Sequence, residues 1–371
     1  MPTVYLDHAA TTPPAPAVLD KMTACAREAW SNPSAVYEAA GAARREMRIA
    51  RRQIAQMLGC DMQELLFTSG GTEANNGALR LAQGKHAVLS AIEHPSVLRA
   101  AQEMRCDVTL VEPDARGVID PQAVAAAIRP ETALISVQAA NNETGVLQPV
   151  VQIGRIARAR RVPYHCDAVQ AFGHVPLSAS DCSLMSISAH KLCGPRGIGA
   201  LYVRSGVMLP PLLVGGEQEF SLRAGTENVP AIAGFGLAAR LAQEDMAARA
   251  QRERALMADF LTQLGEGVPV CRVLGADAPR LPGVAAVFFP HVPAHRFLAA
   301  LDLLGVQASG GAACRMRENA VSPAYRFMGL SKTEAACVLR FSLGRDTAAD
   351  ALHYAAQCVV RVYAELSGCQ P

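Results

Sequence analysis

The sequence has little net charge, few aromatic residues and no long uninterrupted apolar run. Its 35 basic and 33 acidic residues leave a formal net charge of +2, so it lacks the basic excess typical of nucleic-acid binding. No apolar run is long enough to span a bilayer, and residues 1–7 lack the charged and apolar regions of a secretory signal. We therefore expect a cytoplasmic protein that binds neither nucleic acid nor membranes.

Closely paired cysteines are also missing. The eleven cysteines are irregularly spaced and none forms a CxxC pair, which fits neither a disulfide framework nor a zinc site. We therefore expect no metal and mostly reduced thiols. Those expected to be buried and without a catalytic role are Cys25, Cys60, Cys106, Cys166, Cys182, Cys271, Cys337, Cys358 and Cys369.

What the chain does have is a regular alternation of strand and helix patterns. Half of the 371 residues are apolar, which is enough for one large core and a smaller one. A helical pattern from Ser34 to Met57, closed by Gly59, precedes alternating strands and helices between residues 65 and 203. This alternation predicts an α/β fold with a mostly parallel sheet that helices cover on both faces.

A long helical pattern over residues 230–264 then connects to strands and helices in the last hundred residues. We expect a large domain over residues 15–250. Residues 1–14 and 251–371 would form a smaller α+β domain.

Polar residues follow four of the expected strands, where ligands bind in parallel sheets. They are His94, Asn142, Asp167 with Gln170, and Lys191. Each has an ordinary structural explanation: His94 could be a hydrogen-bonded core histidine, Asn142 a turn residue, Asp167 a cap or ion-pair partner, and Lys191 a strand-end lysine. Four such groups meeting at one sheet edge favour a binding site instead.

A glycine turn between a strand and a helix adds an anion-binding element to this set. Gly71 and Thr72 lie where backbone N–H groups and a helix N-terminus can hold a phosphate. A lysine, an acid, an aromatic ring and a phosphate cup together are what pyridoxal 5'-phosphate requires. Lys191 would form the Schiff base, Asp167 would pair with the ring nitrogen, and His94 would stack on the ring.

The ordered motifs of this chain resemble those of the cysteine desulfurases, which have the class V aminotransferase-like, type I pyridoxal phosphate fold. The similarity extends over nearly the whole length. The matching blocks are YLDHAATTP at 5–13, NPS at 32–34, TSGGTE at 68–73, EH at 93–94, NNETG at 141–145, DAVQ at 167–170, SAHK at 188–191, RAGTEN at 223–228 and RFSLGR at 340–345.

The resemblance implies further roles for matching residues. Ser188 and His190 would join Gly71 and Thr72 at the phosphate, and Thr226 would come from the partner subunit of a homodimer. Gln170 would bind the phenolic oxygen of the cofactor. Asn142, which also lies at the cofactor, and Arg340 would hold the carboxylate of the substrate, L-cysteine.

The resemblance also assigns a nucleophile to Cys314, which small residues precede and Arg315-Met316-Arg317 follows. A nearby positive charge lowers a thiol pKa, so a reactive thiolate is plausible there. The implied reaction converts L-cysteine to L-alanine, leaves a persulfide on Cys314 and passes its sulfur to an acceptor protein. Lys191, Cys314 and His94 would be the catalytic residues. Ala312 and the segment after Cys314 depart from the family pattern, which leaves the identity of the acceptor open, a specialised one included.

Two other hypotheses assume the same fold but a different function. A selenocysteine lyase, or another β-eliminating or racemising enzyme, would keep Lys191 and His94 and depend less on Cys314. A dimeric scaffold without activity would need none of these side chains, and their presence argues against it.

Overall fold

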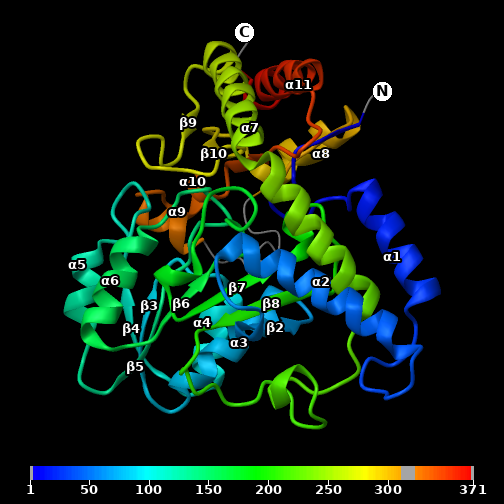
Figure 1. Cartoon of the computed structure of the whole chain (residues 1–371). Coiled ribbons are helices and arrows are strands. Elements are labelled where there is room, and N and C mark those ends of the chain that lie inside the picture. Colours follow the sequence, from blue (N-terminus) through cyan, green and yellow to red (C-terminus); the bar gives the residue numbers. More distant parts are fainter. Residues whose placement is uncertain (1–2, 311–321, 369–371) are drawn as a thin grey trace.

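The chain forms a larger body around a seven-stranded sheet and a smaller body around a three-stranded sheet (Figure 1). The computed structural model describes residues 3–310 and 322–368. Within these residues, no helix is both long and apolar enough to cross a membrane.

The large sheet is mostly parallel, as the sequence predicts. Its strand order is β2-β8-β7-β6-β5-β3-β4, and only the pairs of β8 with β2 and β7 are antiparallel. The strands are β2 (Leu65–Thr68), β3 (His86–Ser90), β4 (Asp107–Val111), β5 (Thr132–Ser136), β6 (Tyr164–Asp167), β7 (Leu184–Ser188) and β8 (Gly199–Val203).

Helices cover both faces of this sheet. Alternate strand residues point to opposite faces, and Val88 packs in one hydrophobic cluster while Ala87 and Leu89 pack in another. The first cluster includes residues of α1 (Pro16–Glu28), α2 (Ala40–Leu58), α5 (Pro121–Ala127), α6 (Val150–Arg160) and α7 (Val229–Gly267). The second includes residues of α3 (Gly71–Leu79) and α4 (Pro95–Glu103).

The helix predicted from Ser34 begins later, at Ala40, and ends at Leu58, with Gly59 as its C-cap as expected. Residues 34–39 form a loop in which Val36 and Tyr37 are exposed. The Arg44 guanidinium donates hydrogen bonds to the carbonyl groups of Pro33 and Ala35. These bonds hold the loop against the first turns of α2. Val36 and Tyr37 therefore do not pack in the core as residues of a longer helix would.

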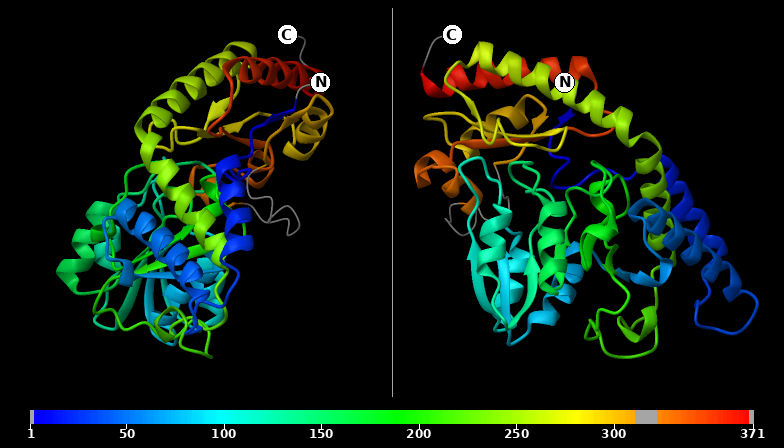
Figure 2. Two further views of the ribbon diagram at one scale, coloured as in Figure 1. Left: turned by 45° about the vertical axis from the view of Figure 1, so that its right-hand side comes forward. Right: turned by 60° about the vertical axis from the view of Figure 1, so that its left-hand side comes forward.

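The smaller body consists of a second sheet and its covering helices. Strands β9 (Arg272–Val273), β10 (Val284–Phe288) and β12 (Val338–Ser342) pair antiparallel, and β1 (Val4–Tyr5) pairs parallel with β11 (Val306–Gln307). The remaining helices are α8 (Ala294–Leu303), α9 (Pro323–Phe327), α10 (Lys332–Ala335) and α11 (Ala349–Ser367). Figure 2 shows that the first strand and the last helix lie together in this body.

Helix α7 connects the two bodies and contributes to both cores. It has 39 residues, a length of about 58 Å at the usual helical rise. Ile232 and Phe235 pack in the core of the large body, whereas Phe260 and Leu264 pack with Val4 in the core of the small one. The predicted domain boundaries at residues 14 and 250 stay a prediction.

Candidate active site

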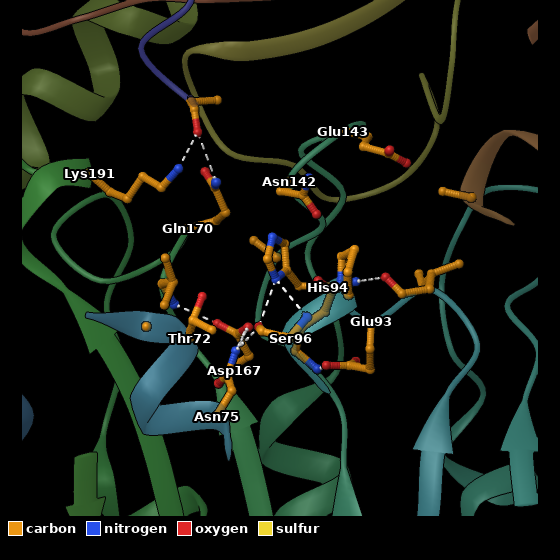
Figure 3. Close-up of a pocket in the computed structure, with 18 of the residues that line it drawn as sticks. Thr72, Asn75, Glu93, His94, Ser96, Asn142, Glu143, Asp167, Gln170 and Lys191 are labelled. Carbon is orange, nitrogen blue, oxygen red and sulfur yellow. Dashed lines mark hydrogen bonds between the residues drawn. The ribbon is translucent and has the colours of Figure 1, made fainter. Parts of the chain in front are cut away.

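A cavity of about 280 Å³ lies at the carboxyl ends of β3, β5, β6 and β7, where these strands meet the N-terminal arm and the small body. It brings together most of the residues that the sequence singled out, from segments far apart in the chain. Those that line it are Gly71, Thr72, His94, Asn142, Asp167, Gln170, His190, Lys191 and Arg340. Several of them are drawn in Figure 3.

Lys191 enters the cavity from a short 3-10 turn, Ala189–Lys191, directly after β7. Its Nζ donates hydrogen bonds to the carbonyl oxygens of Ala9 at 2.7 Å and Ala10 at 2.8 Å. The Nε2 of Gln170 donates to the same Ala9 carbonyl at 3.0 Å, so both side chains approach the N-terminal arm together (Figure 3). The arm thereby fixes the amine in the cavity.

An anion-binding corner lies at the N-terminus of α3. Gly70 has φ of 155° and ψ of −176°, which only glycine adopts readily, and it turns the chain from β2 into α3. The first turn of a helix leaves N–H groups without intrahelical acceptors, and Gly71 and Thr72 present this turn to the cavity. A side chain at position 71 would meet Val169 at 2.6 Å, so only a residue without Cβ fits.

Ser188 and His190 lie beside each other at the end of β7. Ser188 is 1% exposed, and its buried Oγ has no hydrogen-bond partner within the described residues. His190 lines the cavity. Burial, with Lys191 and Arg196 nearby, lowers the pKa of His190 to about 4. His190 is therefore neutral near pH 7 and can donate one hydrogen bond.

Asp167 lies at the end of β6 and accepts a hydrogen bond at each carboxylate oxygen. Its Oδ1 accepts from the backbone N–H of Val169 at 3.0 Å, and its Oδ2 accepts from Asn75 Nδ2 at 2.7 Å. Asn75 Nδ2 also donates to Ser96 Oγ at 2.8 Å, and Ser96 Oγ lies 2.7 Å from His94 Nδ1. Asp167 and His94 are therefore the two ends of one hydrogen-bonded network, which Figure 3 shows.

Glu93, next to His94 in sequence, is buried in the wall of the cavity. Its Oε1 accepts from the backbone N–H of Gln138 at 2.7 Å. Burial, and then the nearby Asp167 carboxylate, raise the pKa of Glu93 well above its ordinary value. The carboxyl group is thus held toward its neutral form in this position.

Arg340 comes from β12 and is 3% exposed. Its Nη1 donates to the carbonyl oxygen of Asn142 at 2.5 Å, and its Nη2 forms an ion pair with Asp7 Oδ1 at 2.6 Å. The two residues predicted to hold the substrate carboxylate are therefore in contact. The guanidinium is positioned at the cavity with Asp7 as its anionic partner.

Three of the predicted residues are not among the described residues that line the cavity: Ser188, which lies two residues before His190, Thr226, and Cys314. Thr226 is exposed and does not line the cavity of its own chain. Cys314 lies outside the described residues. The segment before it ends near the cavity, since the backbone groups of Ser309 and Arg340 exchange two hydrogen bonds, at 3.1 and 2.7 Å. On the other side, Pro323 and Ala324 line the cavity.

The nine cysteines in the described part of the chain are unpaired. Cys25, Cys166, Cys182, Cys337 and Cys358 are buried as expected, whereas Cys60, Cys106 and Cys271 are partly exposed, so the prediction of burial was wrong for these three. Burial raises the thiol pKa at Cys25, Cys60, Cys106, Cys166, Cys182, Cys193, Cys271 and Cys337. These eight are poor nucleophiles at neutral pH.

Sequence reasoning missed Asp7, Asn75 and Ser96 as parts of this site. Asn75 could have been found, because it follows Gly71 by four residues and so shares its helix face. Ser96 could have been noticed as a polar residue in the first turn after His94. Asp7 had no comparable signal, because its pairing with Arg340 spans 333 residues.

Comparison with known proteins gives consistent results. Residues 4–354 match the family model described as Aminotransferase class-V. The chain is 35% identical over 379 residues to a cysteine desulfurase IscS of Dictyoglomus turgidum, with 99% of this chain and 96% of that protein covered. A solved NifS-like protein is 29% identical with a TM-score of 0.91, covering 98% and 100% of the two chains. A structure of SspA in complex with cysteine is 34% identical with a TM-score of 0.82, covering 92% and 99%.

Proposed function

Because the chain belongs to the class V aminotransferase family and, within it, to the cysteine desulfurases, we propose that it converts L-cysteine to L-alanine and transfers the sulfur to an acceptor. The observation that carries this proposal is the meeting of Lys191, Asp167, His94 and Arg340 at one cavity. Relatives named as cysteine desulfurases and a structural neighbour solved with cysteine support the choice of substrate.

The cavity fits pyridoxal 5'-phosphate. The orphaned Ser188 Oγ, the glycine-only position 71 and the first turn of α3 suit a phosphate group. Asp167 would pair with the ring nitrogen, His94 would stack on the ring, and Gln170 would bind the phenolic oxygen, with Asn142 beside them. When bound, the cofactor supplies an electron sink next to the substrate's α-carbon.

Lys191 would hold the cofactor and then act as the base. Its Nζ lies in the cavity, where it can take the proton from the α-carbon of L-cysteine. The carbonyl groups of Ala9 and Ala10 accept hydrogen bonds from this nitrogen. They therefore keep the amine in place while it carries a proton.

Arg340 and Asn142 would orient the substrate through its carboxylate. A guanidinium can bind a carboxylate with two parallel hydrogen bonds. In the structure, Asp7 occupies Nη2 of Arg340, so the substrate would share or replace that contact. This arrangement selects amino acids with a free α-carboxylate.

Cys314 would act as the nucleophile. Its thiolate would attack the sulfur of L-cysteine, so that the S–S bond forms, the bond from Cβ to sulfur breaks and the electron pair stays with the carbon skeleton. Protonation of that skeleton would yield alanine. Cys314 follows Ser309 by five positions in the sequence, so the covalent chain permits a separation of at most about 18 Å from the Ser309–Arg340 contact.

We further propose a cytoplasmic homodimer in which Thr226 completes the phosphate site of the partner subunit. The exposure of Thr226 in its own chain is consistent with that role. The large apolar side chains of Trp30, Val36 and Phe220 are also exposed, as expected of a surface that another subunit covers.

We also propose a large domain over residues 15–250 and a small domain over residues 1–14 and 251–371. The two hydrophobic cores joined by α7 support this division.

The proposal is tested by incubating the purified protein with L-cysteine and measuring alanine and sulfide under reducing conditions. We expect turnover that Lys191→Ala abolishes. Parallel assays with L-selenocysteine and cysteine sulfinate separate a desulfurase from a selenocysteine lyase. Turnover of selenocysteine without turnover of cysteine would contradict the proposal.

A further inference from the structure

Asn75 and Ser96 connect the two ends of the ring-binding site. We propose that they are positioning residues that hold His94 in the tautomer with Nδ1 unprotonated and Nε2 protonated, so that His94 exchanges protons only at Nε2. The inference rests on the proposed function for its consequences in catalysis. The tautomer itself follows from hydrogen bonds within the chain.

The first step is the orientation of the Asn75 amide. Asp167 Oδ2 lies 2.7 Å from Asn75 Nδ2, and an ionised carboxylate can only accept a hydrogen bond. Turning the amide round would place Asn75 Oδ1 against this carboxylate oxygen. The Nδ2 group must therefore face Asp167, and its second hydrogen points to Ser96 Oγ at 2.8 Å.

The second step is the direction of the Ser96 hydroxyl. Its oxygen accepts the hydrogen of Asn75 Nδ2. The single hydroxyl hydrogen is then available for the neighbouring His94 Nδ1 at 2.7 Å. Nδ1 accepts this bond only if it carries no proton.

The third step is independent of the hydroxyl. His94 is the N-cap residue of α4, and its Nδ1 also accepts from the backbone N–H of Ser96 at 3.1 Å. A backbone N–H cannot reverse its direction, so a proton on Nδ1 would face this donor. The positive end of the α4 dipole also disfavours a positive charge on the ring at this position.

The network therefore fixes both the tautomer and the rotation of the His94 ring at the cavity. With Nδ1 occupied by two donors, the neutral ring carries its proton on Nε2. Asn75 and Ser96 also fix the rotation of the ring, because both donors to Nδ1 are anchored, one through Asn75 to Asp167 and the other in the helix backbone. A ring that stacks on a flat ligand requires this fixed orientation.

Nitrogen-15 NMR of the full-length protein labelled at histidine tests the proposal. The His94 signals are assigned by their loss in His94→Asn. We expect Nδ1 to resonate as an unprotonated nitrogen and Nε2 as a protonated one in the wild type. Ser96→Ala and Asn75→Ala leave only the backbone N–H of residue 96 anchored against Nδ1. The Nδ1 resonance should therefore shift part of the way toward the protonated position, and kcat for L-cysteine should fall about tenfold with little change in KM.

Two further variants serve as controls. Ser96→Thr keeps the hydroxyl and should retain the wild-type spectrum. Asn76→Ala removes a neighbouring amide that contacts the Ser96 carbonyl but not its hydroxyl, and it should leave the His94 signals unchanged. A protonated Nδ1 in the wild type, or unchanged His94 signals in both Ser96→Ala and Asn75→Ala, would overturn the inference. The tautomer is read without turnover, so failure of the desulfurase proposal would not affect this result.

Discussion

Arg340 is the residue whose surroundings add most to its sequence motif. It is buried, contacts Asn142 and forms an ion pair with Asp7. The sequence identified Arg340 only through resemblance to a family, since one arginine among many carries no other signal. The pairing with Asp7 required the fold, because only the packing of the N-terminal arm against β12 brings these residues together.

Replacement of Arg340 by alanine should weaken substrate binding. Loss of a charge-assisted hydrogen bond should raise KM for L-cysteine about 10- to 100-fold. Steady-state alanine production measures this change. Arg326→Ala serves as a control, because Arg326 does not line the cavity. An unchanged KM in Arg340→Ala would contradict the assignment of Arg340 to the carboxylate.

His165 should make stability depend on pH. It is 0% exposed, its ring nitrogens contact Ser136 and Ser186, and burial lowers its pKa to about 4. The unfolded histidine takes up a proton near pH 6.5, whereas the folded one does not until about pH 4. The stabilising contribution is therefore complete above pH 6.5 and is lost as the pH falls toward 4.

Urea unfolding between pH 7 and pH 4.5 measures this effect. The free energy of unfolding of the wild type should fall by up to about 3 kcal/mol more than that of His165→Asn over the range. The exposed His353→Gln variant should follow the wild type. Parallel pH curves for the wild type and His165→Asn would show that His165 does not contribute.

The pattern of apolar residues predicted most of the strands and helices of the larger body. The alternation of strand and helix patterns between residues 65 and 203 is confirmed, because β2 to β8 and α3 to α6 lie in this range. The start of α2 was wrong because hydrogen bonds from Arg44 hold residues 33–35 in a loop, and such a contact leaves no trace in periodicity. The roles assigned to the site residues stay predictions.

Helices α2 and α7 pack closely at one glycine. A Cβ added at Gly236 would lie 2.3 Å from the Cα of Ala50, whereas one added at Gly265 of the same helix meets nothing within 4 Å. Gly236→Ala should therefore lower the free energy of unfolding by about 1–3 kcal/mol. Gly265→Ala should raise it by about 0.5–1 kcal/mol, because alanine favours the helix. Thermal or urea unfolding measures the free energy of unfolding of both variants. Equal changes in the two variants would contradict a close contact between α2 and α7 at Gly236.

At the scale of the whole molecule, the cavity lies where two bodies and the N-terminal arm meet. Residues from both sheets line it, and α7 fixes the two cores relative to each other. The sequence predicted two cores and a connecting helix. It could not show that Asp7 pairs with Ser342 and so joins the arm to the small sheet, because this contact links the two ends of the chain.

The proposed homodimer predicts complementation between two defective chains. Lys191→Ala lacks the base, and Thr226→Ala should lack a phosphate contact in its partner's site. A hybrid of these two chains contains one site with both Lys191 and Thr226 intact. Mixed dimers should therefore recover activity that neither homodimer shows, up to about half of the wild-type level per dimer. Activity equal to the sum of the separate variants would contradict the exchange of Thr226 between subunits.

We propose that Cys314 carries the sulfur taken from L-cysteine, and mass spectrometry of the Cys314 peptide after incubation with L-cysteine measures this transfer. We expect this peptide to gain the mass of one sulfur atom, while Cys314→Ala forms no persulfide and loses most alanine production. Undiminished alanine production by Cys314→Ala, with an unmodified Cys314 peptide in the wild type, would show that Cys314 is not the sulfur carrier.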